Sequence, residues 1–285
     1  MIVTRQPEEL RAYLDQARQA GKRVGFHPTM GALHKGHRAN IRKACSECDV
    51  VAVSIFVNPL QFGPTEDFQS YPRDLDGDLA QAEQAGATVV LAPPPEAMFP
   101  EPPLTTVRVQ ELSDRWEGAV RRGHMEGVAT VVTKLFAIAG PCLAYFGEKD
   151  YQQLAVVRRL VSDLSLPVTV VACPTVRETD GLAVSSRNAY LGPAERSAAT
   201  VLYWSLLAGK RAIEERAVTD PSVVRDAMVQ VASAQELFEI DYAEVVDPRS
   251  LEVPRTVSGE VRLLIAGRLG RARLIDNVGA NSEGG

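Results

Sequence analysis

The segment Asp49–Val57 constrains the fold most strongly, because it is an almost uninterrupted run of apolar, mostly β-branched side chains. A strand of this kind is buried on both faces, which is typical of parallel sheets covered by helices. Upstream lie a shorter apolar run at Val24–His27, a glycine-bearing stretch that ends at His37, and a helical pattern over about residues 38–48. The order strand, glycine loop, helix and buried strand predicts a βαβ unit.

The same alternation continues as far as residue 172. We expect helix and strand in turn, starting with a helix, at residues 76–85, 88–91, 128–139, 143–146, 151–164 and 168–172. The segment Pro93–Pro103 carries six prolines and is predicted to be an extended surface loop, because proline fixes φ and donates no hydrogen bond. This rhythm predicts an α/β fold: a Rossmann-like, mostly parallel sheet with helices on both faces.

The sequence changes character after Gly192 and Pro193. A long helical pattern runs from there to about Glu215, a second covers 221–233, and strand-like segments follow at 240–246, 261–266 and 272–275. The stretch Gly267–Gly270 is predicted to form a hairpin turn. A length of 285 residues suits two domains. We assign residues 1–176 to a Rossmann-like domain that binds the ligands, and residues 177–285 to a smaller α+β C-terminal domain.

Charge and hydropathy exclude several classes of protein. The formal net charge is −5 and the pI is about 5.5, so no broad electrostatic attraction to nucleic acid or to an anionic membrane is expected. The most apolar segment is interrupted by Lys134 and by Gly140–Pro141, short of the roughly eighteen residues that a membrane-spanning helix needs. The first residues lack an apolar signal region. We therefore expect a cytoplasmic enzyme with no nucleic-acid or membrane partner.

Two of the four histidines, His34 and His37, stand three residues apart between a predicted strand and a predicted helix. Loops at the carboxyl ends of strands form the ligand crevice of open α/β sheets, and a helix N-terminus there attracts phosphate. Imidazoles can donate hydrogen bonds to phosphate oxygens. Two alternatives stay open: a metal-binding pair, which lacks further ligands between residues 28 and 42, and a pair that only caps the helix. His27 is interpreted as a packed residue, and His124 as a candidate near the site.

Three further strand-end segments carry polar side chains. Asn58 and Gln61 follow the buried strand, and amide groups suit a hydroxyl or a carboxylate, although Asn-Pro is also a common turn. Lys149 follows another strand beside a glycine, where an ammonium group suits phosphate, and Asp150 is equally suited to capping the next helix. The loop Ser185–Arg187 could grip phosphate, although Ser-Ser-Arg alone is a weak signal.

These segments together closely resemble one family. The stretches Pro28–His37, Ser54–Gly63, Phe146–Gln153 and Pro174–Asn188 occur in the order found in the pantothenate synthetase family, which belongs to the nucleotidyltransferases. The resemblance covers residues 1–191 and continues more weakly beyond them. It implies an ATP- and Mg²⁺-dependent ligase that joins pantoate to β-alanine through a pantoyl adenylate. It also implies a homodimer. We expect the C-terminal domain to close over the nucleotide as a lid, because water would otherwise hydrolyse the acyl adenylate.

The resemblance also implies the roles of individual residues. It makes His34, His37, Lys149 and Arg187 the catalytic residues, with His37 as the proton donor. Gln61, Gln153 and Asn58 would bind the substrates. ATP would be bound by three groups of residues: Met30, Gly31, Ala32, Leu33, His34, Lys35, Gly36 and His37; Gly147, Glu148, Lys149 and Asp150; and Val176, Val184, Ser185, Ser186 and Arg187.

The sequence departs from the family where acidic residues often follow Tyr-Pro-Arg near a magnesium ion. Here Gly77 stands within that run, between Asp76 and Asp78. We therefore assign no protein ligand to the metal and expect Mg²⁺ to be held mainly by the triphosphate and water.

Two rival functions would use the same loop with His34 and His37, residues 28–37, which we call the histidine loop. One is a cytidylyl- or adenylyltransferase that leaves the nucleotide on its product. The other is a synthetase-like RNA-binding module, which the acidic pI and the six lysines disfavour.

Overall fold

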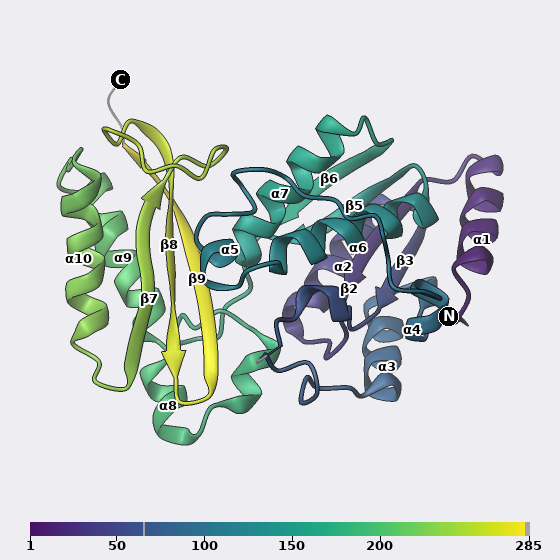
Figure 1. Cartoon of the computed structure of the whole chain (residues 1–285), viewed down its shortest axis with the longest axis horizontal. Coiled ribbons are helices and arrows are strands. Elements are labelled where there is room, and N and C mark those ends of the chain that lie inside the picture. The colour runs from purple at the N-terminus through teal and green to yellow at the C-terminus, as the bar shows by residue number, and fades with distance from the viewer. Residues whose placement is uncertain (65, 283–285) are drawn as a thin grey trace. The chain divides into compact units, whose positions relative to one another are not determined.

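The computed structural model describes residues 1–64 and 66–282 (Figure 1). The chain forms two compact units. The first consists of Met1–Glu148 and Gln152–Pro174, and the second of Lys149–Tyr151 together with the chain from Thr175 onward. Whether each unit is a domain with the predicted boundary between residues 176 and 177 stays a prediction.

The first unit is built on a six-stranded sheet in the order β1-β4-β3-β2-β5-β6, and every pairing in it is parallel. The central strand β3 has five consecutive buried residues, because helices cover both of its faces. This confirms the predicted α/β fold. The strands are β1 Ile2–Thr4, β2 Val24–Thr29, β3 Val50–Ile55, β4 Val89–Leu91, β5 Cys142–Gly147 and β6 Val168–Cys173.

Helices flank this sheet (Figure 1). On one face a core that includes Ile41, Ala82, Val51 and Val53 joins two of the helices to β3. The helices are α1 Pro7–Gln19, α2 Lys35–Glu47, α3 Leu75–Ala85, α4 Pro95–Met98, α5 Glu117–Val120, α6 His124–Ala139 and α7 Tyr151–Asp163. Among the described residues, none of the helices has both the length and the apolar character needed to cross a bilayer.

Some predicted boundaries were wrong. The helix α2 begins at Lys35 rather than near 38, and α6 begins at His124 rather than near 128. The proline-rich segment Pro93–Pro103 was predicted to be extended throughout, whereas Pro95–Met98 forms the short helix α4. Proline is well suited to the first position of a helix, where its missing N–H costs no hydrogen bond.

The second unit is a three-stranded antiparallel sheet in the order β7-β8-β9, covered by helices. Its core includes Leu206, Met228, Val245 and Leu263, all fully buried. The smaller α+β C-terminal architecture is therefore confirmed. The elements are α8 Pro193–Ala198, α9 Val201–Glu214, α10 Pro221–Ser233, β7 Phe238–Val246, β8 Gly259–Leu269 and β9 Ala272–Ser282.

Two predictions for this unit need correction. The helix expected from Pro193 to Glu215 is two helices, α8 and α9, separated at Ala199 and Thr200. The hairpin between β8 and β9 is present, but its turn is only Gly270–Arg271, and Gly267 lies within β8. Gly270 has a φ of 55°, which suits a glycine in a tight hairpin turn.

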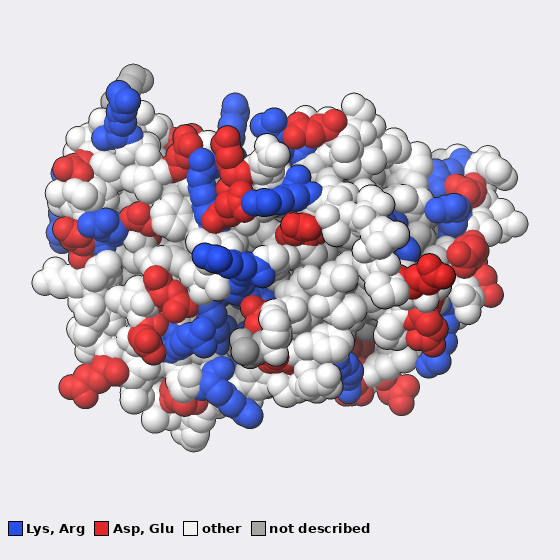
Figure 2. Space-filling model, in the orientation of Figure 1, with Lys and Arg blue, Asp and Glu red and all other residues white. Residues whose placement is uncertain are grey.

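Basic and acidic side chains lie among one another on the face shown in Figure 2. This mixture accords with the small formal net charge of −5.

Candidate active site

Three of the predicted motifs follow neighbouring strands of the parallel sheet. The strands β3, β2 and β5 lie side by side, and their pairings are parallel. The histidine loop follows β2, Asn58–Gln61 follows β3, and Gly147 and Glu148 stand at the end of β5. Because parallel strands end at one edge of a sheet, the fold brings these motifs to the same edge. The chain connections diverge between β2 and β5, and ligands bind at such switch points.

The two histidines form a reciprocal cap on α2. His34 is the N-cap residue, and its Nδ1 accepts the backbone N–H of Gly36 at 3.2 Å. The Nδ1 of His37 accepts the backbone N–H of His34 at 3.3 Å, and the two rings stack with centroids 4.0 Å apart. Since Nδ1 accepts in each ring, the proton of the neutral imidazole lies on Nε2. The two histidines therefore cap α2, and the same arrangement places an N–H donor at Nε2 of each ring. Whether they only cap the helix or also contact phosphate stays a prediction.

Asp78 holds the histidine loop from the side. Its carboxylate accepts the backbone N–H groups of Ala32 at 2.9 Å and of Leu33 at 2.6 Å. A Cβ on Gly31 would approach Asp78 Oδ2 to 2.7 Å, and Gly31 has a φ of 86°, so the loop requires glycine there. Burial raises the pKa of Asp78, and these two hydrogen bonds oppose that rise. From the sequence, this acidic run was weighed only as a metal site, and its contact with the loop was not predicted.

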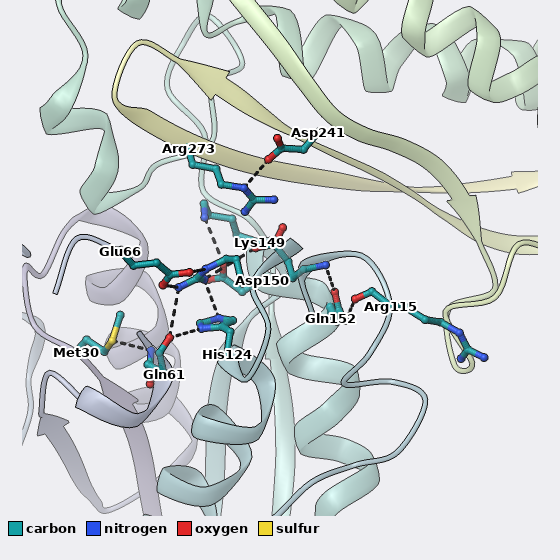
Figure 3. Close-up of polar contacts among 12 residues, drawn as sticks. Met30, Gln61, Glu66, Arg115, His124, Lys149, Asp150, Gln152, Asp241 and Arg273 are labelled. Carbon is teal, nitrogen blue, oxygen red and sulfur yellow. Dashed lines mark hydrogen bonds and ion pairs between the residues drawn. The ribbon is translucent and has the colours of Figure 1, made fainter. Parts of the chain in front are cut away.

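Gln61 lies in a single turn of 3-10 helix, η1 (Pro59–Gln61), directly after β3. Asn58 opens that turn by accepting the backbone N–H of Leu60. Its Nδ2 donates to Gln61 Oε1 and to the carbonyl oxygen of Gly127, both at 3.1 Å. Gln61 Nε2 donates to the sulfur of Met30 in the histidine loop (Figure 3). The carboxamide of Gln61 is thus oriented by two neighbours, and Asn58 forms the turn as well as holding Gln61.

A second set of contacts fixes the backbone of Gln61. His124 Nδ1 donates to the Gln61 carbonyl oxygen at 2.8 Å, and Arg121 Nη1 donates to His124 Nε2 at 2.9 Å (Figure 3). Arg121 also donates to both carboxylate oxygens of Glu66, at 2.9 and 2.6 Å. Burial, followed by the charge of Arg121, lowers the pKa of His124 to about 4. The ring is therefore neutral near pH 7. Only a neutral imidazole can donate from one nitrogen, here to Gln61, and accept at the other, here from Arg121.

The helix α6 approaches this turn very closely. A Cβ on Gly127 would lie against the Leu60 carbonyl oxygen and within 2.7 Å of Gln61 Cα. Only glycine allows the backbones to pack at this separation. Gly127, Arg121 and Glu66 were not predicted from the sequence. The scarcity of histidine was the one signal that pointed to this segment, through His124.

His27 is the packed histidine that was predicted. Its side chain is buried and its Nδ1 donates to the carbonyl oxygen of Tyr145 at 2.8 Å. Burial lowers its pKa to about 4, so the ring is neutral. Its centroid lies 5.7 Å from that of His37, beneath the histidine loop.

The two adjacent glutamines of α7 differ in their surroundings. Gln152 is buried, and its amide donates to the carbonyl oxygen of Arg115 (Figure 3). It also donates to the carbonyl oxygen of Leu112 and accepts from the N–H of Glu117, so it holds the loop at 112–117. Gln153 is only partly buried. Of the pair, Gln153 therefore remains the candidate for substrate binding, and that role stays a prediction.

The other predicted ATP-binding residues lie in the second unit. Lys149 Nζ is 3.4 Å from Asp150 Oδ1, and both belong to a single turn of 3-10 helix, η2 (Glu148–Asp150), which leads into α7 at Tyr151. Val184 donates its backbone N–H to the Val176 carbonyl oxygen at 2.9 Å, so these two residues face each other across a hairpin. Ser185 follows the hairpin directly and caps the short helix η3 (Ser186–Tyr190), its Oγ accepting from the N–H of Arg187.

The side chains offer few options for a protein-bound metal. Within residues 1–64 and 66–282, no three His, Cys, Asp or Glu side chains are grouped as metal ligands. Nδ1 of each histidine in the loop is occupied by the α2 cap, and the Asp78 carboxylate by two backbone N–H groups.

Comparison with known proteins identifies relatives over nearly the entire chain. A family model described as Pantoate-beta-alanine ligase matches residues 2–279. The protein named pantothenate synthetase from Heliobacterium modesticaldum is 49% identical over 272 residues, which cover 95% of this chain and 96% of that protein. The protein of the same name from Caldicellulosiruptor bescii is 45% identical over 278 residues, 98% of each chain.

Solved structures agree. The crystal structure of pantothenate synthetase from Thermus thermophilus matches with a TM-score of 0.92 and 48% identity, covering 98% of this chain and 99% of that one. A pantoate-beta-alanine ligase from Francisella tularensis, complexed with beta-gamma ATP and beta-alanine, matches with a TM-score of 0.80 and 32% identity, covering 100% and 99%.

Proposed function

Because the chain belongs to the pantoate-beta-alanine ligase family, we infer that it is an ATP-dependent ligase that joins pantoate to β-alanine. The observation that carries the function is the family match over residues 2–279. The geometry of the first unit supports it: a histidine-capped helix N-terminus and a buried, oriented glutamine lie at one edge of the sheet. Neither rival function accounts for the identity of the relatives.

We propose two chemical steps. A carboxylate oxygen of pantoate attacks the α-phosphorus of ATP, and the bond from that phosphorus to the bridging oxygen breaks, releasing pyrophosphate. The amine of β-alanine then attacks the carbonyl carbon of the pantoyl adenylate, loses a proton and expels AMP. Both steps are direct displacements between bound substrates, so the protein contributes mainly positioning and stabilisation of phosphate charge.

The catalytic roles follow from charge and from donor position. His34 and His37 each carry a proton on Nε2 at the N-terminus of α2, where phosphate oxygens are stabilised. We propose that His37 is the donor to the leaving phosphate, through a hydrogen bond from its Nε2–H. Lys149 and Arg187 supply positive charge to the phosphates, and each well-placed donor is worth roughly 2.7–4 kcal/mol of transition-state stabilisation.

The remaining ATP contacts are proposed from the family resemblance. The loop around the histidines is held in shape by the hydrogen bonds from the backbone N–H groups of Ala32 and Leu33 to Asp78. In the second unit the hairpin carries two contacts, and the residues that follow it contact the phosphates. These contacts are Met30, Gly31, Ala32, Leu33, Lys35, Gly36, Gly147, Glu148, Asp150, Val176, Val184, Ser185 and Ser186.

Gln61 is the proposed shared contact of pantoate and β-alanine. Its carboxamide is buried and already oriented by Asn58 and Met30, so little conformational freedom is lost when a substrate binds. Asn58 assists substrate binding by holding Gln61 Oε1. Gln153 is the second proposed contact of pantoate.

Mg²⁺ is proposed to enter as part of the substrate, bound to the triphosphate and to water. The arrangement of Asp78 supports this, because both of its carboxylate oxygens accept backbone hydrogen bonds. Mg²⁺ commonly binds through substrate phosphates and retains several waters.

Assembly, location and closure are also proposed from the family. The enzyme is a cytoplasmic homodimer, and the second unit is a lid that excludes water from the acyl adenylate. If the protein sediments as a monomer, the dimer is contradicted. If ATP and pantoate leave the small-angle scattering profile unchanged, the lid is contradicted.

One experiment tests the reaction itself. Labelled pyrophosphate should exchange into ATP when pantoate is present and β-alanine is absent, because the first step is then reversible. Addition of β-alanine should release AMP and free pyrophosphate. An adenylyltransferase would instead leave the nucleotide on its product, and failure of the pantoate-dependent exchange would refute the proposed order of steps.

A further inference from the structure

Two segments with proposed phosphate contacts are attached to consecutive residues of one strand. The turn 149–151 carries Lys149, and the hairpin 176–184 leads into Ser185–Arg187. Both segments belong to the second unit, and both are hydrogen-bonded to β9, at Asn277 and Asp276 respectively.

Asn277 holds residues 149–151, which we call the lysine turn, through the backbone of Lys149. Its Nδ2 donates to the carbonyl oxygen of Lys149 at 2.7 Å, across 128 residues of sequence. Its Oδ1 accepts from Arg262 Nε at 2.7 Å, and the guanidinium of Arg262 lies 4.2 Å from the ring centroid of Tyr151. Tyr151 in turn donates its hydroxyl proton to the carbonyl oxygen of Pro248. The turn is therefore fastened at both of its ends.

Asp276 holds the hairpin through Arg177. The guanidinium donates to both carboxylate oxygens, at 2.6 and 2.9 Å, and also to the carbonyl oxygen of Asn277 at 3.2 Å. Arg177 donates a further hydrogen bond to the carbonyl oxygen of Gly181, at the tip of the hairpin, at 3.0 Å. Its guanidinium also stacks on Tyr203, 4.4 Å from the ring centroid. A bidentate pair of this kind fixes orientation as well as distance.

Adjacent Asp and Asn residues are unusual in a strand interior, where both are depleted. Here they are almost completely buried, with 4% and 3% of their surface exposed. Buried polar side chains are costly unless they are hydrogen-bonded, and these two direct their polar atoms to the lysine turn, to the hairpin and to the arginine beside the turn. Their chemistry is therefore matched to holding the two segments.

We propose that Asp276 and Asn277 are positioning residues, which fix the spacing between Lys149 and the loop Ser185–Arg187 and thereby set the affinity for the triphosphate of ATP. This inference rests on the proposed function, since it takes both segments to be phosphate contacts. A rigid β9 keeps the cationic groups at one separation. The protein therefore loses less conformational freedom when ATP binds than it would if these groups lay on two independent loops.

The first test replaces Asn277 in the full chain. Asn277→Ala should weaken the binding of ATP, measured by calorimetry, about tenfold or more, while the KM for pantoate stays unchanged. Asn277→Asp keeps the shape and an acceptor for Arg262 but removes the donor to Lys149, so it should weaken ATP binding similarly. Asn281→Ala, which removes an exposed asparagine of the same strand, is the matched control and should bind ATP normally.

A double-mutant cycle distinguishes positioning from general loss of structure. If Asn277 acts through Lys149, then Asn277→Ala should have little further effect in a Lys149→Ala background. By the same reasoning, Asp276→Asn should weaken ATP binding in the parent enzyme but have little effect in an Arg187→Ala background. Fully additive effects in both cycles would overturn the inference.

The outcomes separate this inference from the proposed function. In one outcome the parent enzyme catalyses the pantoate-dependent exchange, and the folded Asn277→Ala and Asn277→Asp variants bind ATP as tightly as Asn281→Ala does. This outcome would overturn the positioning role and leave the proposed function intact. If Asn277→Ala does not fold, Asn277→Asp decides the question by the same measurement. A parent enzyme without the exchange would overturn both.

Discussion

The carboxylate of Asp78 accepts the backbone N–H of Leu33 at 2.6 Å, although the two residues are 45 positions apart in the sequence. The second carboxylate oxygen accepts the N–H of the preceding residue, Ala32. Ala32 has a φ of 50°, an uncommon conformation for a residue with a side chain, and these hydrogen bonds hold it there. The start of α3 therefore determines the shape of the loop that carries the histidines.

Replacement of Asp78 by Asn should disturb that loop. One of the two acceptors becomes a donor that faces a backbone N–H, which should cost about 1–3 kcal/mol of unfolding free energy. We expect kcat/KM for ATP to fall about tenfold or more. Asp76→Asn, at an exposed position in the same turn of α3, is the control. Equal kinetics for the two variants would show that the contact does not matter for ATP.

Replacement of His37 separates capping from catalysis. His37→Asn leaves an acceptor near Nδ1 for the N–H of His34 but removes Nε2. We expect stability close to that of the parent and an exchange rate about 10²–10³ lower, as for the loss of one oxyanion donor. His37→Ala should lose the cap as well, about 1 kcal/mol. An active His37→Asn enzyme would assign the histidine to structure alone.

Replacement of His124 should act on substrate binding through Gln61. His124→Ala removes the donor to the Gln61 carbonyl oxygen and the acceptor that His124 offers to Nη1 of Arg121, so the KM for pantoate should rise about tenfold. His124→Asn places an amide donor near the position of Nδ1 and should recover part of the loss. Steady-state kinetics with pantoate varied checks both variants; a fall in kcat alone would argue for a direct chemical role instead.

Substitution of Gly127 tests the close packing of α6 on η1. In Gly127→Ala the new methyl group meets the Leu60 carbonyl oxygen, so the turn that carries Gln61 must shift. We expect a loss of about 1–3 kcal/mol in unfolding free energy and a higher KM for pantoate. Gly192→Ala is the matched control, because a Cβ there would be in ordinary contact, 3.6 Å from Glu195. Denaturant titration and kinetics of both variants decide the outcome.

Stability should fall as the solution is acidified. His27 and His124 both have a folded pKa of about 4, against about 6.5 in the unfolded chain, so the unfolded state binds more protons between these values. Their contribution is fully present above pH 6.5 and is lost as the pH falls towards 4. Between pH 7.5 and 5, each should contribute a loss of roughly 2 kcal/mol. Urea unfolding at both pH values measures the difference, and His124→Asn should reduce it by about half; an unchanged difference would contradict the assignment.

Much of the fold could be read from local patterns. The apolar run of β3 and the regular alternation of helix and strand predicted the parallel sheet, because burial on both faces leaves a signal within a few residues. Boundaries were less accurate, as at α4 and at the break between α8 and α9, where short-range propensity does not decide the outcome. The histidine loop and Gln61 could be identified from the sequence because two signals agree for them. Both directly follow a predicted strand, and both lie in a stretch that carries the family resemblance.

The contacts that orient those residues could not be predicted from the sequence. Asp78 with Leu33, His124 with Gln61 and Asn277 with Lys149 join residues that are 45, 63 and 128 positions apart. A hydrogen bond between distant residues leaves no periodicity or spacing in either segment, because it depends on how the elements pack. The sequence by itself thus determined the main helices and strands and the chemical groups available, whereas the tertiary structure alone decided which buried polar side chains hold those groups in place.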